Sequence, residues 1–316
     1  GHPQTAVSTW LNGGLFGPTP FDHTYKGYFM GGNAYQYDEW VRIFYYANDT
    51  VVQSADNLNA TPYGGDGTNG TNGTKGYNYH SQDAAPTYTS GKFDRITYAT
   101  DATDVVTEIV ESPTRAAVGC CFNDGTAFYA MGGSTTNYRS EVDKFTQPGE
   151  SRSQISDTLS QGSAHCCGAS DSTTSGFRFG GYSGSASAVI DKIAFSDDCI
   201  TTVSDTLEEA SYWLKATSNY DGRKGYISHG TAGEEVDKMD YTNDTISALS
   251  TPFTNTGHAC YITDNGVAMY CGGGVGMLGS IQKMVYATET ITLVVDDTMP
   301  ESAQNMTGCE NHESSV

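Results

Sequence analysis

The side chains that could carry chemistry are scattered along this sequence rather than gathered into a catalytic motif. Its seven histidines include no His-Glu-x-x-His pair, the pattern that presents two zinc ligands on one helix face. His80 and His229 are weak candidates for a ligand-binding site, because each follows an aromatic stretch at the same position of a repeated unit. A metal or sugar site is one interpretation of these two residues, and a local hydrogen bond is the other.

The eight cysteines also allow two interpretations. An even number in a long chain is a weak disulfide signal, whereas most of them fall in one kind of short strand, where a small buried side chain packs well. If Asn265 and Gly266 form a two-residue turn, Cys260 and Cys271 face each other as a hydrogen-bonded pair, a geometry unfavourable for a disulfide. We therefore expect free thiols.

Basic residues recur at one place in a short motif of the form hydrophobic, acidic, basic, hydrophobic. Its acidic position is held by Asp94, Asp143, Asp191 and Asp237, for which we expect pairing between repeat units. Six of the 16 basic residues are assigned to its basic position: Arg42, Arg95, Lys144, Lys192, Lys238 and Lys283. We predict that these six form a ring of equivalent positions, each contacting an acidic or carbonyl partner. This role is structural, and no catalytic residue, metal ligand or cofactor is expected.

The basic motif belongs to a sixfold repeat. An aromatic-rich strand ending in Gly-Gly or a variant has anchors near residues 28, 77, 129, 177, 226 and 269. A preceding strand joined by a tight turn, the basic motif and a closing β-branched stretch accompany it in most units. Four short antiparallel strands in each of six units predict an all-β fold, a six-bladed β-propeller that occupies 1–316 as a single domain. The Gly-Gly pairs are expected where a strand meets the crowded centre.

The chain ends and two internal segments complete this prediction. Thr5 to Ser8 resembles a fourth strand and Asn305 to Cys309 a first strand, so terminal strands are expected to close the ring. The low-complexity run from Gly64 to Gly76 is predicted to be a flexible surface loop. The stretch from Thr206 to Thr217 has helical composition, but the repeat makes it a connection followed by a first strand.

Composition argues against two classes of function. A net charge of −21 in 316 residues repels nucleic acid. No run approaches the ~18 apolar residues of a membrane-spanning helix, so membrane insertion is not expected. The 21 tyrosines and 12 phenylalanines supply a core although only 37% of the residues are apolar.

The order of these elements resembles that of kelch-like propellers, most clearly over Arg115 to Gly133 and His258 to Gly273. A closer similarity is to repeat proteins in bacteriophages of aquatic bacteria, which carry Gly-Tyr-Phe-x-Gly-Gly followed by Val-Asp-Lys-Ile-x-Tyr. Val236 to Thr245 matches that second motif, except that Met239 takes the place of Ile. Such repeats specify a fold more directly than a function.

The resemblance implies a non-enzymatic structural or adhesion protein of a virion, in a tail fibre or particle appendage. The partners implied are other virion proteins, further copies of the chain, and a glycan or protein on the host surface. One alternative is a secreted cell-surface or matrix propeller that binds glycans, and another is a carbohydrate-active propeller enzyme. The termini and long loops are expected to carry contacts between subunits.

Overall fold

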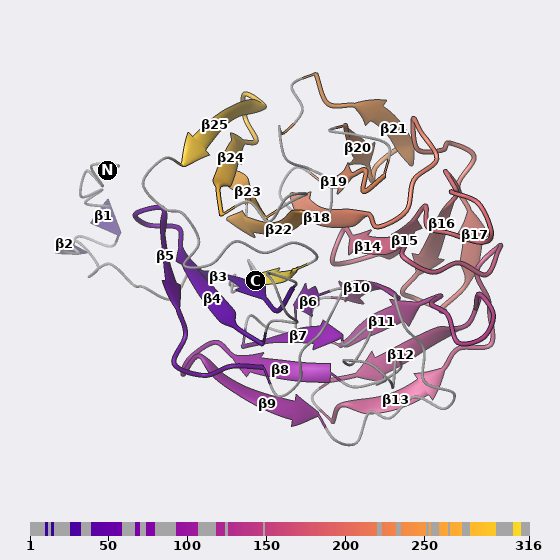
Figure 1. Ribbon diagram of the computed structural model, residues 1–316, viewed down its shortest axis with the longest axis horizontal. Helices are drawn as coiled ribbons and strands as arrows, with labels where there is room; N and C mark the ends of the chain where they lie inside the picture. The colour runs from indigo at the N-terminus through magenta and orange to yellow at the C-terminus, as the bar shows by residue number, and fades with distance from the viewer. Residues whose placement is uncertain are drawn as a thin grey trace.

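Six four-stranded antiparallel sheets are arranged around a common centre in the computed structural model of the protein (Figure 1). The protein is a six-bladed β-propeller, as the repeat predicts. The structure describes residues 10–11, 14–15, 26–32, 39–58, 67–69, 74–79, 93–106, 118–123, 126–147, 149–219, 223–231, 235–250, 253, 259–264, 266–273, 279–294 and 306–310. We number the blades from the first complete β-meander, so that blade 1 contains β3, β4 and β5.

Each blade has four strands, and their order in the sheet goes from the centre of the propeller to its rim (Figure 1). The first strands, which contact one another around the centre, are β26 (Thr307–Glu310), β6 (Gly67–Asn69), β10 (Gly119–Asn123), β14 (Cys167–Ser170), β18 (Lys215–Asn219) and β22 (Ala259–Asp264). The second strands are β3 (Lys26–Met30), β7 (Lys75–Tyr79), β11 (Ala127–Met131), β15 (Ser175–Phe179), β19 (Lys224–Ser228) and β23 (Ala268–Gly273).

The third strands carry the basic motif, and the fourth strands lie at the rim. The third strands are β4 (Val41–Tyr45), β8 (Phe93–Thr97), β12 (Val142–Thr146), β16 (Ile190–Ala194), β20 (Val236–Asp240) and β24 (Ile281–Val285). The fourth strands are β5 (Thr50–Gln53), β9 (Ala102–Val106), β13 (Ser151–Gln154), β17 (Ile200–Thr202), β21 (Thr245–Ala248) and β25 (Thr290–Val294). A separate hairpin pairs β1 (Trp10–Leu11) with β2 (Gly14–Leu15).

Burial explains why the second strand is the most regular part of the repeat. Its residues are buried on both faces, because neighbouring blades pack against it from either side. Aromatic side chains fill the resulting space: Phe128 stacks on Phe145 and meets Phe93 of the preceding blade edge to face. The fourth strands are largely exposed, and that of blade 3, Ser151–Gln154, is correspondingly polar. The many aromatic side chains of the sequence therefore form the contacts between neighbouring blades.

The C-terminal strand completes blade 1. β26 pairs with β3 in the register Cys309↔Tyr28, so the last strand of the chain becomes the first strand of the first blade. This confirms the predicted use of Asn305 to Cys309, and it removes an unpaired sheet edge at the centre. The other terminal strand of the prediction, Thr5 to Ser8, lies outside the described residues.

Three local predictions need correction. Gly67–Asn69, within the segment predicted to be a flexible loop, forms the first strand of blade 2, because backbone hydrogen bonds to β7 define that strand. The Gly-Gly pairs do not face the centre: Gly132 and Gly180 have left-handed φ of 69° and 54°, and each lies against the connection that enters the next blade. The sixth anchor is Tyr270 rather than Met269, since Tyr270 is the residue opposite Lys283. The expected absence of a helix over 206–217 is confirmed.

The cysteine register also differs from the prediction. The turn after β22 has three residues between the paired positions Asp264 and Ala268, so Cys271 lies opposite Tyr261 rather than Cys260. The Val267 N–H donates to the Asp264 carbonyl at 2.9 Å, so Gly266, with a φ of 70°, takes the third position of a β-turn, where glycine is favoured. The six cysteines whose side chains are described are free thiols, as expected.

Candidate functional site

One face of the propeller carries an ion pair across every blade boundary. In each pair a Lys or Arg of one blade meets a carboxylate in the turn between the third and fourth strands of the next, with N···O distances of 2.6 to 3.0 Å. The pairs are Lys26–Asp101, Arg95–Glu150, Lys144–Asp198, Lys192–Asp244, Lys238–Glu289 and Lys283–Asp49. We call each an interblade latch and the face that carries them the latched face.

The backbone of each acidic residue is shaped for this contact. All six have left-handed φ values, between 51° and 59°, in the turn just before the fourth strand. Asp tolerates this conformation better than most residues, and four of the six are Asp. The turn points the carboxylate sideways to the neighbouring blade.

Tyrosine hydroxyls strengthen four of the latches. Tyr28, Tyr77, Tyr129 and Tyr270 each donate a hydrogen bond of 2.7 to 2.9 Å to the carboxylate of the next blade. Burial, and then the neighbouring carboxylate, raise the pKa of Tyr28 far above its usual value. Burial is also the largest cause that raises the pKa values of Tyr77 and Tyr270, so these three hydroxyls stay protonated and remain donors at physiological pH.

The same second-strand aromatics stack on the next blade. Five parallel or nearly parallel pairs have centroids 4.9 to 5.4 Å apart: Tyr28–Tyr98, Tyr129–Phe195, Phe177–Tyr241, Tyr226–Tyr286 and Tyr270–Tyr46. At the remaining boundary, the Tyr77 hydroxyl donates to the side chain of Gln147 instead. A stacked pair adds about 0.5–1.5 kcal/mol beyond the area it buries, so the boundaries are held by packing as well as charge.

The predicted ring of equivalent basic positions is confirmed at five residues; Arg42 has a carbonyl partner, as predicted, but does not occupy the equivalent position. Arg95, Lys144, Lys192, Lys238 and Lys283 all lie opposite the second-strand aromatic and all reach the next blade.

In blade 1 the residue opposite Tyr28 is Ile43, and Arg42 occupies the acidic position of the motif. Arg42 is completely buried, and its Nη1 donates to the Gly31 carbonyl at 3.4 Å. Lys26, on the second strand of blade 1, supplies the missing ammonium for the latch to Asp101. The repeat therefore keeps the contact while moving the charge to another strand.

The acidic residues of the motif act mainly within their own blade. Asp191 accepts from Arg178 at 2.5 Å, and both side chains are fully buried. Asp143 pairs with Arg152 of the fourth strand. Asp191 also accepts the backbone N–H of Ser160, in the connection from blade 3. The predicted pairing between blades is thus present as a contact to the incoming connection, while the charged partner is local.

His229 is buried and bonded within blade 5. Its Nε2 lies 2.9 Å from the Asp237 carboxylate, which also accepts the backbone N–H of Glu208. It takes the position of the first glycine of the Gly-Gly pair, and it lies in the sheet core rather than at a surface. The geometry matches the local hydrogen bond that the sequence allowed as one interpretation. His80 lies outside the described residues, so the proposed His80–His229 relationship stays a prediction.

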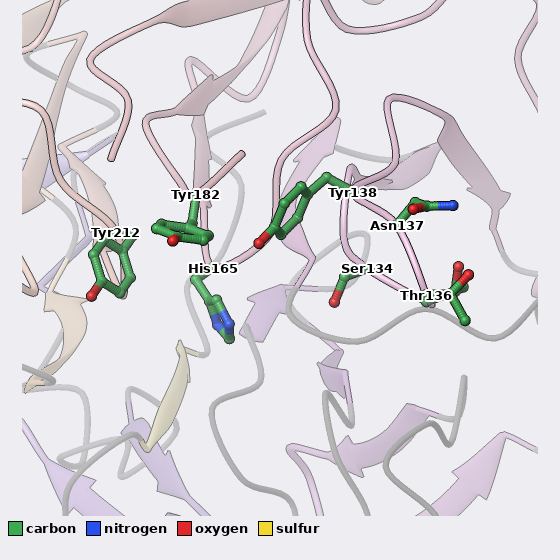
Figure 2. Close-up of a pocket in the computed structure, with 8 residues that line it drawn as sticks. Ser134, Thr136, Asn137, Tyr138, His165, Tyr182 and Tyr212 are labelled. Atoms are coloured by element: carbon green, nitrogen blue, oxygen red, sulfur yellow. The ribbon is translucent and has the colours of Figure 1, made fainter. Parts of the chain in front are cut away.

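The opposite face, which carries the connections between second and third strands, has a pocket over blades 3 to 5. Its volume is about 510 Å³, within the range of roughly 300–1,000 Å³ that small-molecule sites occupy. Figure 2 shows Tyr212, Tyr182 and Tyr138 in a row, with His165 and Ser134 beside them. The lining residues are Ser134, Thr135, Thr136, Asn137, Tyr138, His165, Tyr182 and Tyr212. We call this the tyrosine pocket, and the face the loop face.

The three tyrosine rings contact one another at steep angles. Tyr138 and Tyr182 have centroids 5.6 Å apart at 76°, and Tyr182 and Tyr212 are 5.0 Å apart at 56°. Tyr138 is 41% exposed, a high value for so large an aromatic side chain. The row therefore presents a stepped aromatic wall to solvent.

Two bulky residues beside this wall have strained backbones. His165 and Trp213 have left-handed φ values of 55° and 59°, which are uncommon for bulky side chains. Their rings lie against each other with centroids 3.7 Å apart. The Trp213 N–H donates to the His165 carbonyl at 2.9 Å, so the two residues support each other. Strained conformations of this kind cluster at ligand sites and other functional positions.

The two loops that hold the tyrosines are built alike. The Gly133 N–H donates to the Ser163 carbonyl, and the Ser163 N–H donates back to the Arg139 carbonyl. Gly181, Ser211 and Ser187 repeat the pattern one blade later. Each loop is thereby bonded to the connection that enters the following blade, so the pocket walls are fixed before any ligand binds.

Other kinds of site find little support in the part of the chain that the structure describes. No group of three or more His, Cys, Asp or Glu side chains is placed to hold a metal ion among those residues. No helix among them is long and apolar enough to cross a membrane. The lining of the tyrosine pocket includes no Asp, Glu, Lys or Arg.

Sequence reasoning missed both the carboxylates of the latches and the tyrosine pocket. The carboxylates had a visible signal, since an acidic residue stands one or two positions before the fourth strand in every unit, as in Asp244-Thr245 and Glu289-Thr290. The pocket had none, because Tyr138, Tyr182 and Tyr212 occupy three different positions of the repeat. No protein-family model matches the sequence, and comparison with curated proteins finds no relative. Function is therefore argued from the two faces themselves.

Proposed function

We propose that the protein is a non-enzymatic structural or adhesion component of a phage particle, in a tail fibre or appendage, and that it acts by assembly and host-surface binding. The tyrosine pocket is the observation that carries the binding role. Its lining of aromatic, hydroxyl, amide and imidazole groups can hold a ligand by stacking and hydrogen bonding. The particle context is supported by the repeat motifs, which resemble those of phage virion proteins.

The division of the molecule into two faces supports this role. The interblade latches fix the relative positions of the six blades, which suits a module that bears load between neighbouring subunits. The loop face then displays its pocket on a rigid base. Rigid presentation favours binding, because less conformational freedom is lost when the ligand docks.

A secreted glycan-binding propeller is the second candidate, and the same pocket favours it. The carbohydrate-active enzyme is the weaker alternative. Glycoside hydrolysis commonly uses two carboxyl groups about 5–9.5 Å apart, and the residues described in the lining of the tyrosine pocket include none. Binding without turnover is the better description of that pocket.

Labelling intact particles tests the proposed context. An antibody against the purified protein, detected by gold labelling in the electron microscope, is expected to mark a fixed location on phage particles from the source culture. Mass spectrometry of gradient-purified particles should find the chain at a constant ratio to the capsid protein. Recovery of the chain from culture medium without particles would favour the secreted alternative instead.

A further inference from the structure

We infer that the tyrosine pocket binds an uncharged saccharide, with a pyranose ring packed against the aromatic wall. This inference deepens the proposed binding role and rests on it only for its biological meaning. The occupant is identified by the chemistry of the lining, by the charge of the chain and by the rigidity of the walls.

The lining matches the two kinds of surface that a sugar presents. A pyranose ring has an apolar face of C–H groups, which packs flat against an aromatic ring. Its rim carries hydroxyls that both donate and accept hydrogen bonds. Tyr182 and Tyr212 supply ring faces, while Ser134, Thr136 and Asn137 supply hydroxyl and amide groups on the facing loop.

The steep angles between neighbouring tyrosine rings suit a sugar ring that is contacted on two sides. A sugar stacked on one tyrosine meets the edge of the next, because Tyr138 and Tyr182 cross at 76°. The hydroxyls of these tyrosines differ from those on the latched face. Among the described residues no hydrogen bond joins the Tyr138, Tyr182 or Tyr212 hydroxyl to another side chain, whereas the Tyr28 and Tyr129 hydroxyls are bonded to carboxylates. The pocket hydroxyls are thus available to a ligand.

Charge points to a neutral ligand. The chain carries a net charge of −21, which repels anionic glycans over long distances. The guanidinium of Arg139, the residue that follows Tyr138, is already paired with Glu141. The described lining includes no carboxylate, so it offers a cationic sugar no ion pair either. Sialic acids and uronic acids are therefore poor ligands, and neutral hexoses and N-acetylhexosamines are good ones.

Preformed walls distinguish this pocket from a surface gap. A side chain at Gly162 would collide with the Tyr138 carbonyl at 2.6 Å, so the loop is pressed onto the connection that enters blade 4. The backbone of Tyr182 exchanges two hydrogen bonds with Ala164, at 2.7 and 3.0 Å. These bonds do not involve the tyrosine side chain. Replacing the side chain therefore leaves the loop in place, which makes the inference testable.

Titration calorimetry with the purified full chain tests this inference. The probes are maltotriose, cellotriose and chitotriose as neutral saccharides, and sialyllactose as an anionic one. We expect saturable binding of at least one neutral probe and none of sialyllactose. Tyr182→Ala should weaken that binding by about tenfold or more, because it removes the central ring face, whereas Tyr182→Phe should retain most of it.

Two controls separate a lost ligand contact from a lost fold. Val267→Ala replaces an exposed side chain on the latched face and should leave affinity unchanged. The thermal midpoint of Tyr182→Ala should equal that of the wild type. Failure of all three neutral probes to bind overturns the inference, as does equal binding by the wild type and a folded Tyr182→Ala variant. Particle labelling is independent of these titrations, so a protein found on particles that binds no saccharide refutes this inference and leaves the proposed function standing.

Discussion

Asp264 offers a sharp test of the electrostatics on the latched face. It is the last residue of β22, beside the latch between Lys283 and Asp49. Burial raises the pKa of Asp264 to about 6, and Lys283 lowers it while Asp49 raises it further. The folded protein therefore holds a proton on this carboxyl more tightly than the unfolded chain does. Asp264→Asn, which mimics the protonated acid, removes the cost of ionising it.

The size and the sign of the stability difference between Asp264→Asn and the wild type follow from the pKa of Asp264 in the folded and in the unfolded chain. A shift from 3.8 to about 6 corresponds to an upper bound of about 3 kcal/mol at 1.36 kcal/mol per unit. Because the side chain is partly exposed, solvent screening reduces the expected value to about 1–2 kcal/mol. The contribution of Asp264 to stability is intact below pH 4 and is lost as the pH rises through its folded pKa of about 6. Relative to wild type, Asp264→Asn should gain little near pH 4 and about 1–2 kcal/mol above pH 6.5.

Urea unfolding followed by tyrosine and tryptophan fluorescence between pH 4 and 8 measures this difference. Glu150→Gln is the matched variant of opposite sign. Burial alone would raise the pKa of Glu150, but hydrogen bonds from Arg95, Tyr77 and Lys75 lower it. Its contribution is therefore present at neutral pH and lost as the pH falls, so Glu150→Gln should be destabilised most at pH 7. A stability difference for Asp264→Asn that is flat across this range, or a loss at pH 7, would refute the reasoning.

Three further predictions concern packing and thiol chemistry. Gly225→Ala should lose about 1–3 kcal/mol of unfolding free energy in urea titrations, because the added methyl group overlaps the Tyr241 hydroxyl. Adding Tyr241→Leu to the same chain removes that hydroxyl and should recover part of the loss. Deleting 306–316 removes β26 and should lower the thermal midpoint sharply in calorimetry, since β3 then lacks its inner partner; an unchanged midpoint would mean that the ring does not need this closure. Of the six cysteines with described side chains, Cys199 alone is exposed and should react with a maleimide in the native state, as peptide mapping can show; rapid labelling of a second one of the six would contradict the described burial.

The architecture could be predicted from the sequence because the repeated residues are the ones that pack between the blades. Tyr77, Tyr129 and Tyr226 recur at one position of the repeat, since each must fill an equivalent boundary between blades. The inner strand β6 escaped prediction for the opposite reason. Its pairing with β7 uses backbone hydrogen bonds, and a Gly-Thr-Asn sequence leaves no apolar pattern to recognise.

Arg42 shows where a repeat alignment misleads. The spacing of Trp40, Val41 and Arg42 imitates the motif when it is shifted by one residue, and a shift of one residue turns a side chain to the other face of its strand. Only the strand pairing, which sets Ile43 opposite Tyr28, reveals that the latch of blade 1 draws its charge from Lys26. Positions that carry one function across a repeat need not carry it on the same strand.

The tyrosine pocket could not be read from the repeat, because it is made where the blades differ. Tyr138 and Tyr182 lie at different positions of two loops that share one hydrogen-bond pattern, and Tyr212 comes from a third blade. A latch is needed at each of the six blade boundaries, so its residues recur at regular intervals along the sequence. A binding site on the loop face needs to occur only once. Its residues are free to depart from the period, and the departures at Tyr138, Tyr182 and Tyr212, which converge in one pocket, are those to which we assign the proposed binding role.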